Sequence, residues 1–224
     1  MQRSSAPMEF ETPRLYLRDW RPAEDARHAM DIFGDARVAK WMKPGQYHRG
    51  TEHVAKDTSI RQVQGRLVRY ADQAGKSKKG DRSWAVVQKD IGRVIGAVEI
   101  AMLPDMEEVR AEHIPEPIEG GLSTEYMEIG WYFRPSSWGF GYASEAAGQI
   151  VRHSFETLNL PVLLAVTQPE NVRAIAVTKR LRMRSEGLTA RCYGGKPLLL
   201  HTLTAEIWTK TTVIPEHMHT PKSQ

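Results

Sequence analysis

Cysteine is almost absent from this 224-residue chain, since Cys192 is the single one, and an internal disulfide is therefore excluded. Such a composition fits a reducing compartment. No apolar run approaches the ~18 residues that a membrane-spanning helix needs, and the first ten residues lack the apolar core of a signal peptide. We therefore expect a cytoplasmic protein with no membrane partner, in which Cys192 is a buried and unreactive thiol.

Strong charge of either sign is also missing. The formal net charge is +4, and the basic residues do not gather on one aromatic-bearing set of strands. This mild excess suits an anionic ligand, and it shows no pattern typical of RNA-binding proteins, so nucleic acid is not an expected partner. The composition is that of a globular protein, and we expect one domain over residues 9–211, flexible tails at 1–8 and 212–224, and no metal.

The most informative segment is an apolar strand that enters a loop with two glycines, 139 and 141, and opens directly into a helix. Glycines there let the backbone approach a ligand and turn its N–H groups toward it. The first turn of the helix adds unpaired N–H donors and a positive dipole end. This junction favours phosphate binding, although an ordinary tight turn is the alternative. The glycine spacing excludes a dinucleotide-binding Rossmann unit.

The flanking residues have clear periodicity. In the strand 125–133, Met127, Ile129, Trp131 and Phe133 share a face that we expect in the core, and Glu128 lies on the opposite, non-core face. An apolar stripe predicts a helix over 142–158. The further expected strands are 13–18, 83–89, 93–103, 161–167, 187–194 and 198–208, and the further helices are 22–33, 35–41, about 50–73 from near Thr51, and one from Asn171.

Several of these motifs resemble the GNAT acyltransferases, whose phosphate loop reads Arg/Gln-x-x-Gly-x-Gly/Ala. Here it is Ser136-Ser-Trp-Gly-Phe-Gly141, with Ser at the Arg/Gln position. The segments Glu128-Ile-Gly-Trp131 and Pro169-Glu-Asn171 are similar to one branch, the ribosomal-protein N-terminal (Rim-type) acetyltransferases. The resemblance covers about residues 10–208. It implies a mixed α/β fold, with a mostly antiparallel sheet opened by a splayed parallel pair and flanked by helices, and it implies acetyl-CoA as co-substrate; dimers are common in this branch.

The resemblance also implies roles for individual residues. Glu128 matches the proposed catalytic base of the Rim-type branch, although pairing with a neighbouring Arg is the alternative. Backbone groups near 131–133 would pair with the pantetheine arm, and Asn171 would contact CoA, a role compatible with capping a helix. The implied cofactor-binding residues are Trp131, Tyr132, Phe133, Trp138, Gly139, Phe140, Gly141, Tyr142, Ala143 and Asn171.

The chain also departs from the family. Thr178 stands where many relatives carry the Tyr that protonates the leaving thiolate, and Ala174 stands where the Rim-type branch usually has Ser. No general acid is therefore assigned, and Tyr193 is a distant substitute. We expect an N-acetyltransferase acting by direct attack of a primary amine, with a protein N-terminus or lysine favoured. The alternatives are a small-molecule amine acetyltransferase and a non-catalytic acyl-CoA-binding protein. The acidic segment 104–124 would attract a cationic amine such as a basic N-terminus, a lysine or a polyamine, although an ordinary solvated loop is the alternative.

Overall fold

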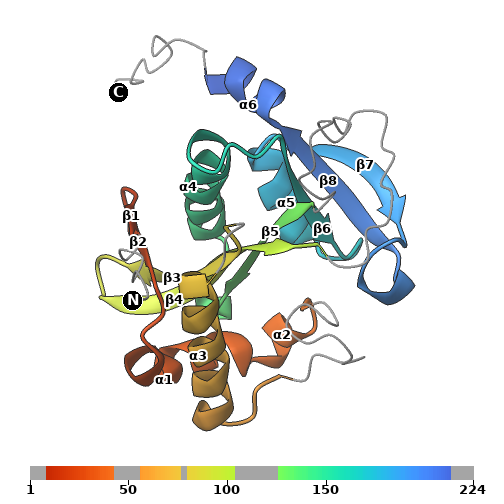
Figure 1. Ribbon diagram of the computed structural model, residues 1–224. Helices are drawn as coiled ribbons and strands as arrows, with labels where there is room; N and C mark the ends of the chain where they lie inside the picture. The colour runs from red at the N-terminus through yellow and green to blue at the C-terminus, as the bar shows by residue number, and fades with distance from the viewer. Residues whose placement is uncertain (1–8, 43–55, 77–79, 104–125, 213–224) are drawn as a thin grey trace, which may run out of the picture.

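The computed structural model describes residues 9–42, 56–76, 80–103 and 126–212 (Figure 1). Its strands are β1 (Phe10–Glu11), β2 (Leu15–Arg18), β3 (Arg82–Gln88), β4 (Arg93–Met102), β5 (Met127–Phe133), β6 (Val162–Thr167), β7 (Arg184–Thr189) and β8 (Leu198–Thr204). Its helices are α1 (Pro22–Phe33), α2 (Ala36–Ala39), α3 (Ile60–Lys76), α4 (Tyr142–Glu156), α5 (Val172–Arg180) and α6 (Ala205–Thr212), with short 3-10 turns η1 (Pro135–Ser137) and η2 (Tyr193–Gly195). The acidic segment 104–124 and the expected tails, apart from Thr212, lie outside the described residues.

The strands form one sheet in the order β1-β2-β3-β4-β5-β6-β8-β7. Neighbouring strands are antiparallel except β5 and β6, which run parallel and pair at one point, Glu128 opposite Leu164. By contrast, β4 and β5 pair along their length, from Gly96 opposite Phe133 to Met102 opposite Met127. The expected fold class, a mixed α/β protein with a mostly antiparallel sheet opened by a parallel pair, is confirmed.

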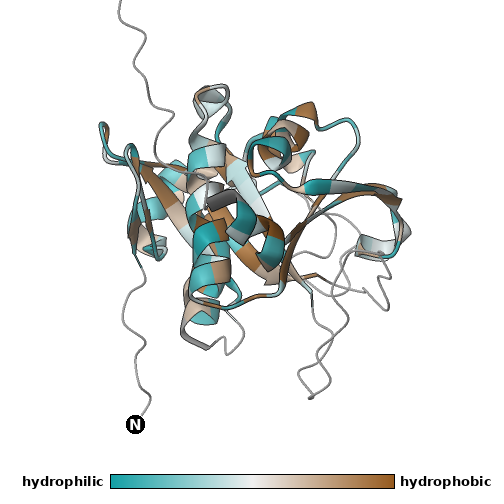
Figure 2. Ribbon diagram, turned by 90° about the horizontal axis from the view of Figure 1, so that it is seen from above, coloured by the Kyte–Doolittle hydropathy of each residue, from teal (hydrophilic) through white to brown (hydrophobic). Residues whose placement is uncertain are grey.

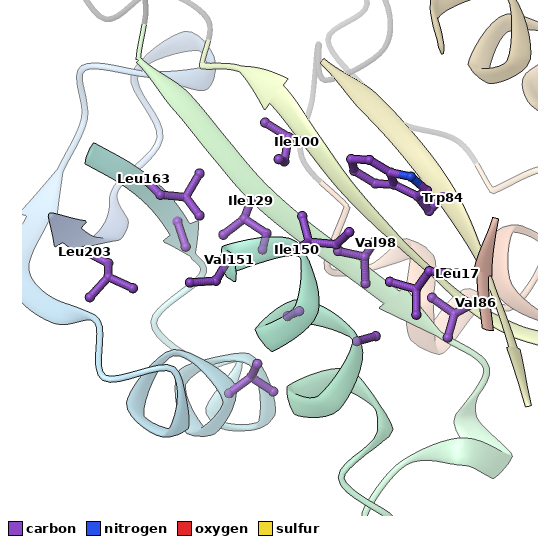
Figure 3. Packing of buried hydrophobic residues seen from close by; sticks show 14 of the residues in the cluster. Leu17, Trp84, Val86, Val98, Ile100, Ile129, Ile150, Val151, Leu163 and Leu203 are labelled. Carbon is purple, nitrogen blue, oxygen red and sulfur yellow. The ribbon is translucent and has the colours of Figure 1, made fainter. Parts of the chain in front are cut away.

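Helices cover both faces of the sheet. Figure 1 shows α1 and α3 on one face and α4 on the other. The α4 face holds a large apolar core in which Ile150 and Val151 of α4 pack toward Ile129 and Val98 of the sheet (Figure 3). The α1 and α3 face holds a second core, which includes Phe33. In Figure 2 the hydrophobic segments gather along the central strands and the helices packed on them.

Because helices cover both faces, the strand β5 is buried on both sides. Met127, Ile129 and Phe133 belong to the core under α4, as predicted, with Trp131 packed against it. Tyr132, from the opposite face, belongs to the core under α1 and α3. The prediction that Glu128 lies on a non-core face was therefore wrong, since its exposed fraction is 2%.

Helix α3 begins later than predicted, at Ile60, and the described residues 56–59 precede it. A capping box sets this start. The Gln62 N–H donates to the Ser59 Oγ at 3.3 Å, while the Gln62 side chain accepts from the Thr58 N–H at 2.7 Å. The first bond satisfies a backbone donor of the first turn, and the second satisfies the N–H of Thr58, just before Ser59. The predicted start near Thr51 lies outside the described residues.

The C-terminal hairpin also differs from the prediction. Its first strand ends at Thr189 rather than 194, and residues 193–195 form η2. Its second strand ends at Thr204, where the chain turns into α6 instead of continuing as a strand to 208. The Ala205 N–H donates to the Pro161 carbonyl at 3.0 Å, and the Thr204 Oγ1 accepts from the Ile207 N–H at 3.3 Å. Within the described ranges, no helix has the length and apolar character needed to cross a membrane.

Candidate active site

A pocket of about 420 Å³ lies where β5 and β6 part. Its walls come from β5, the loop after η1, the first turn of α4, the end of β6, α5 and the region of α2. All ten residues that the sequence singles out for cofactor binding line this pocket: Trp131, Tyr132, Phe133, Trp138, Gly139, Phe140, Gly141, Tyr142, Ala143 and Asn171. Residues from three separate parts of the chain are therefore brought to one cavity.

The two glycines of the loop adopt backbone angles that other residues rarely take. Gly139 has φ +88° and Gly141 has φ +81°. Gly141 is also the N-cap of α4, and its residue type leaves the helix without a side-chain cap. The indole N–H of Trp138 donates to the Phe133 carbonyl at 2.7 Å, which ties the loop to the end of β5. The first N–H groups of α4 thus face the pocket without a side-chain competitor.

Two residues of the turn between β1 and β2 hold this loop and the start of α4 in place. Glu145, in the first turn of α4, accepts from the Thr12 hydroxyl at 2.6 Å and from the Arg14 Nε at 2.7 Å. The Arg14 Nη1 also donates to the Phe140 carbonyl at 2.9 Å. Burial alone would raise the pKa of Glu145, but hydrogen bonds from Thr12 and Arg14 outweigh it and lower the pKa. Arg14 offsets the charge of Glu145 at the helix end where an anion would bind.

The backbone of β5 has donors on its β6 side. The Arg134 N–H donates to the Ile95 carbonyl on the β4 side at 3.0 Å. Because successive N–H groups of a strand point to opposite sides, those of Trp131 and Phe133 point away from β4, toward β6. The single pairing point of β5 and β6, at Glu128, lies before these residues. The splay inferred from the family resemblance is therefore present in this sheet.

Glu128 sits at the base of this opening and is not among the residues that line the pocket. Its carboxylate is buried and held from two directions. The Val166 N–H of β6 donates to Oε1 at 3.4 Å, and the Tyr193 hydroxyl of η2 donates to Oε2. The backbone donor that β6 would otherwise offer to β5 is thus directed to this carboxylate.

Tyr193 lies much closer to the site than its place in the sequence predicts. Its side chain is buried, and burial raises the pKa of its phenol well above the usual value, with Tyr132, Glu99 and Cys192 contributing in the same direction. Its hydroxyl donates to Glu128, and Tyr193 is not among the residues that line the pocket. A role of Tyr193 as substitute general acid stays a prediction.

Asn171 and Thr178 have clear structural partners. The Asn171 Oδ1 accepts from the Ala174 N–H at 3.1 Å, so Asn171 caps α5 while also lining the pocket. The Thr178 hydroxyl is buried and donates to the Ile175 carbonyl of its own helix at 2.9 Å. Thr178 is not among the pocket-lining residues. Its hydroxyl therefore has no geometry for replacing the Tyr of the relatives.

Two arginines of α5 were missed by the sequence reasoning. Arg173 and Arg180 line the pocket, and they are the charged side chains in its described lining. The Arg173 guanidinium also lies 5.0 Å from the centre of the Trp138 ring. Their spacing of seven residues places both on one helical face, a signal that the sequence did contain. Two cationic side chains beside the uncapped N-terminus of α4 suit an anionic ligand.

Other lining residues were recognisable only from the fold. Val38 and Trp41 reach the pocket from the region of α2, and the Gln168 side chain donates to the Lys40 carbonyl at 3.1 Å, joining that region to the end of β6. The Ser144 hydroxyl lines the pocket and has no hydrogen-bond partner among the described residues. These contacts join segments more than a hundred residues apart.

Comparison with known proteins agrees with this geometry. A family profile described as "Acetyltransferase (GNAT) domain" matches residues 14–184. The uncharacterized N-acetyltransferase YnaD of Bacillus subtilis (strain 168) is 45% identical over 65 residues, 29% of this chain and 38% of that protein. The uncharacterized N-acetyltransferase p20 of Bacillus licheniformis is 27% identical over 79% of this chain and 83% of that protein. The match to YnaD thus spans well under half the length of that protein.

Solved structures share the fold. A GNAT-family acetyltransferase from Bacillus anthracis superposes with a TM-score of 0.63 and 21% identity, covering 89% of this chain and 99% of that one. The ribosomal-protein-S5-alanine acetyltransferase from Vibrio fischeri superposes with a TM-score of 0.61 and 16% identity, covering 90% and 98%. At these identities the likeness establishes the fold, and the acceptor of this chain is a separate question.

Proposed function

This chain belongs to the GNAT acetyltransferase family, and on that basis we propose that it transfers the acetyl group of acetyl-CoA to a primary amine. The observation that carries this proposal is the pocket itself. It joins a glycine loop at a helix N-terminus, a strand with N–H groups directed into an opening of the sheet, and two arginines. These features suit the diphosphate, the amide-bearing pantetheine arm and the thioester of acetyl-CoA.

We assign the residues of the pocket to parts of this substrate. The loop from Gly139 to Ala143 holds the diphosphate through main-chain N–H groups, whereas the Trp138 N–H donates to the Pro135 carbonyl and that residue lines the pocket with its ring. Arg173 and Arg180 add positive charge. The backbone of residues 131–133 pairs with the pantetheine arm. Asn171 contacts the substrate near the thioester while it caps α5.

The reaction that we propose is direct attack by a neutral amine. The amine nitrogen forms a bond to the thioester carbonyl carbon, the carbon–sulfur bond then breaks, and the thiolate leaves with the electron pair. Because an alkyl ammonium has a pKa near ~10 and a chain N-terminus near ~8, a base must remove a proton. Glu128 takes this role, through a water molecule because its carboxylate is buried.

We favour a protein N-terminus or a lysine as the acceptor, with a small amine as the alternative. The support is the shared fold with an enzyme named for a ribosomal-protein alanine.

A non-catalytic acyl-CoA-binding protein is the second candidate. The observation that favours it is the Thr178 hydroxyl, which is bound to its own helix, so α5 supplies no general acid at that position. Such a protein would bind acetyl-CoA and release no free thiol with any amine.

The test begins with isothermal titration of acetyl-CoA into the purified protein. Free thiol is then followed with acetyl-CoA and separate acceptors: peptides beginning with alanine or serine, an N-terminally blocked lysine peptide, and spermidine. We expect micromolar binding and amine-dependent thiol release that is strongly reduced in Glu128→Gln. Binding with no turnover on any acceptor would favour the non-catalytic alternative, and absence of binding would refute the proposal.

A further inference from the structure

We propose that Tyr193 is a positioning residue for Glu128, holding its carboxylate ionised and oriented where β5 and β6 part. This inference rests on the proposed function, because it assigns Tyr193 a role through the proposed base. It concerns a residue from η2, 65 positions away in the chain, that no family motif described above includes.

The contacts fix both oxygens of the carboxylate. The Val166 N–H reaches Oε1 from β6, and the Tyr193 hydroxyl reaches Oε2 from η2. Each carboxylate oxygen can in general accept two hydrogen bonds, so the carboxylate can be held by the protein and still exchange a proton with a water molecule or an amine. Because the carboxylate and the phenol are both buried, bulk water does not compete for the hydrogen bond between them.

The backbone at Tyr193 adopts an unusual conformation to make this contact. Its φ is +51°, in the left-handed region that bulky residues seldom enter, and Gly194 and Gly195 follow at +71° and +81°. The two glycines adopt such angles freely, whereas the tyrosine does so at a conformational cost. A turn can form at this position without an aromatic residue. The backbone conformation of Tyr193 instead places its hydroxyl within hydrogen-bonding distance of Glu128.

Because of the charges around Glu128, the hydrogen bond from Tyr193 bears on whether this carboxylate is ionised. Glu99 of β4 lies on the same face of the sheet, because Ala101 pairs with Glu128 and Glu99 with Gly130. The Tyr132 hydroxyl donates to the Glu99 Oε1 at 3.3 Å. A neighbouring carboxylate and burial both disfavour the ionised form of Glu128, whereas donation from Tyr193 favours it.

The titratable groups Cys192 and Tyr193 do not reverse the expected direction of the Glu128 protonation change. Cys192 is buried beside Tyr193, and burial raises the pKa of the Tyr193 phenol, so the phenol keeps its proton through the neutral range. It therefore remains a donor whenever Glu128 is required as a base. Loss of the donor alone makes Glu128 protonate at a higher pH.

The experiment measures kcat against pH for wild type and Tyr193→Phe, with acetyl-CoA and an alanine-initiated peptide. A hydrogen bond to a charged group corresponds to a shift of about one to two pH units, so we expect the acid-side midpoint to rise by that amount. The Kd for acetyl-CoA should change less than about twofold. Tyr16→Phe removes an exposed phenol on β2 and should leave the profile unchanged.

A second variant covers the case in which Tyr193→Phe does not fold. Incorporation of 3-fluorotyrosine at position 193 keeps the ring and hydroxyl and makes the phenol a stronger donor, so the midpoint should fall. In a Glu128→Gln background, Tyr193→Phe should cause little further loss, because the two residues act as one unit.

The outcomes separate the two proposals. If wild type acetylates the peptide with a Glu128-dependent acid limb, and folded Tyr193 variants leave its midpoint in place, the inference fails and the proposed function stands. If no acceptor releases thiol, or Glu128→Gln keeps full activity, the proposed base is wrong and the inference fails with it.

Discussion

Substitution of one loop glycine tests the phosphate-binding role without a steric complication. In Gly139→Ala the new Cβ would have no atom within 4 Å, although the backbone has φ +88°. The effect is therefore confined to backbone conformation. Holding a non-glycine residue in the left-handed region costs roughly 1–2 kcal/mol. For a protein of this size, each 1 kcal/mol lowers Tm by about 2–4 °C.

The chain contains a matched control for this strain. Gly92, in the turn between β3 and β4, has φ +61° and also has open space around an added Cβ. It is not among the pocket-lining residues. Gly92→Ala should thus lower Tm by a similar amount without altering the loop. A difference in acetyl-CoA affinity between the two variants then reports the function of the loop, because both variants lose similar stability from a non-glycine residue in the left-handed region.

Binding is the decisive measurement. If Gly139→Ala turns one loop N–H away from the diphosphate, a hydrogen bond to a charged group is lost, worth about 1.5–3 kcal/mol. This corresponds to a rise in the Kd for acetyl-CoA of about 10- to 100-fold, measured by isothermal titration. Gly92→Ala should stay within about twofold of wild type. Equal affinities in both variants, despite a lowered Tm in each, would refute the assignment of the loop.

Three further predictions concern catalysis and stability. Glu128→Gln should lower kcat by about 10²–10⁴ while the Kd for acetyl-CoA is retained, as measured by steady-state kinetics and titration. The folded-state pKa of Glu145 is lowered, so its ionised carboxylate stabilises the fold above the unfolded pKa of about 4.3, and this stabilisation is lost as pH falls through the folded pKa. In urea unfolding from pH 6 to 3, the free energy of unfolding of Glu145→Gln should therefore fall less steeply than that of wild type. Burial, with a contribution from Arg82, lowers the pKa of His153, so the unfolded chain binds more protons below about pH 6.5 and stability falls there. His153→Phe should flatten this decline between pH 7 and 5.5, and an unchanged slope would contradict the assignment.

Local patterns in the sequence were sufficient for the loop and its flanking elements. The period of two in β5, the stripe in α4 and the glycine pair are determined within about thirty residues. The structure has β5 and α4 where these patterns predict them. The ten residues predicted to bind the cofactor line one pocket, and their cofactor-binding role stays a prediction. The capping box at Ser59 was also a local signal, and reading it would have placed the start of α3 correctly.

Long-range contacts were not accessible in this way. The Arg14–Glu145 pair joins residues 131 positions apart, and the Tyr193–Glu128 pair joins residues 65 apart. No periodicity connects such residues, because their proximity depends on the order of strands in the sheet. The burial of Glu128 was missed for a related reason: alternation identifies two faces of a strand, but it does not reveal that η2 and β6 enclose this carboxylate on the second face.

The parting of β5 and β6 creates two internal edges within a continuous sheet. An ordinary sheet has unpaired backbone groups only along its outer strands, where another polypeptide can add. Here the edges lie inside the sheet, because β5 and β6 pair at one point only, and α4 and α5 pack on these strands. A molecule that pairs with these edges must be narrow and extended and must carry amide groups spaced like those of a strand. We therefore expect the sheet itself to favour a narrow ligand with backbone-like polar groups, in addition to the charge that Arg173 and Arg180 supply.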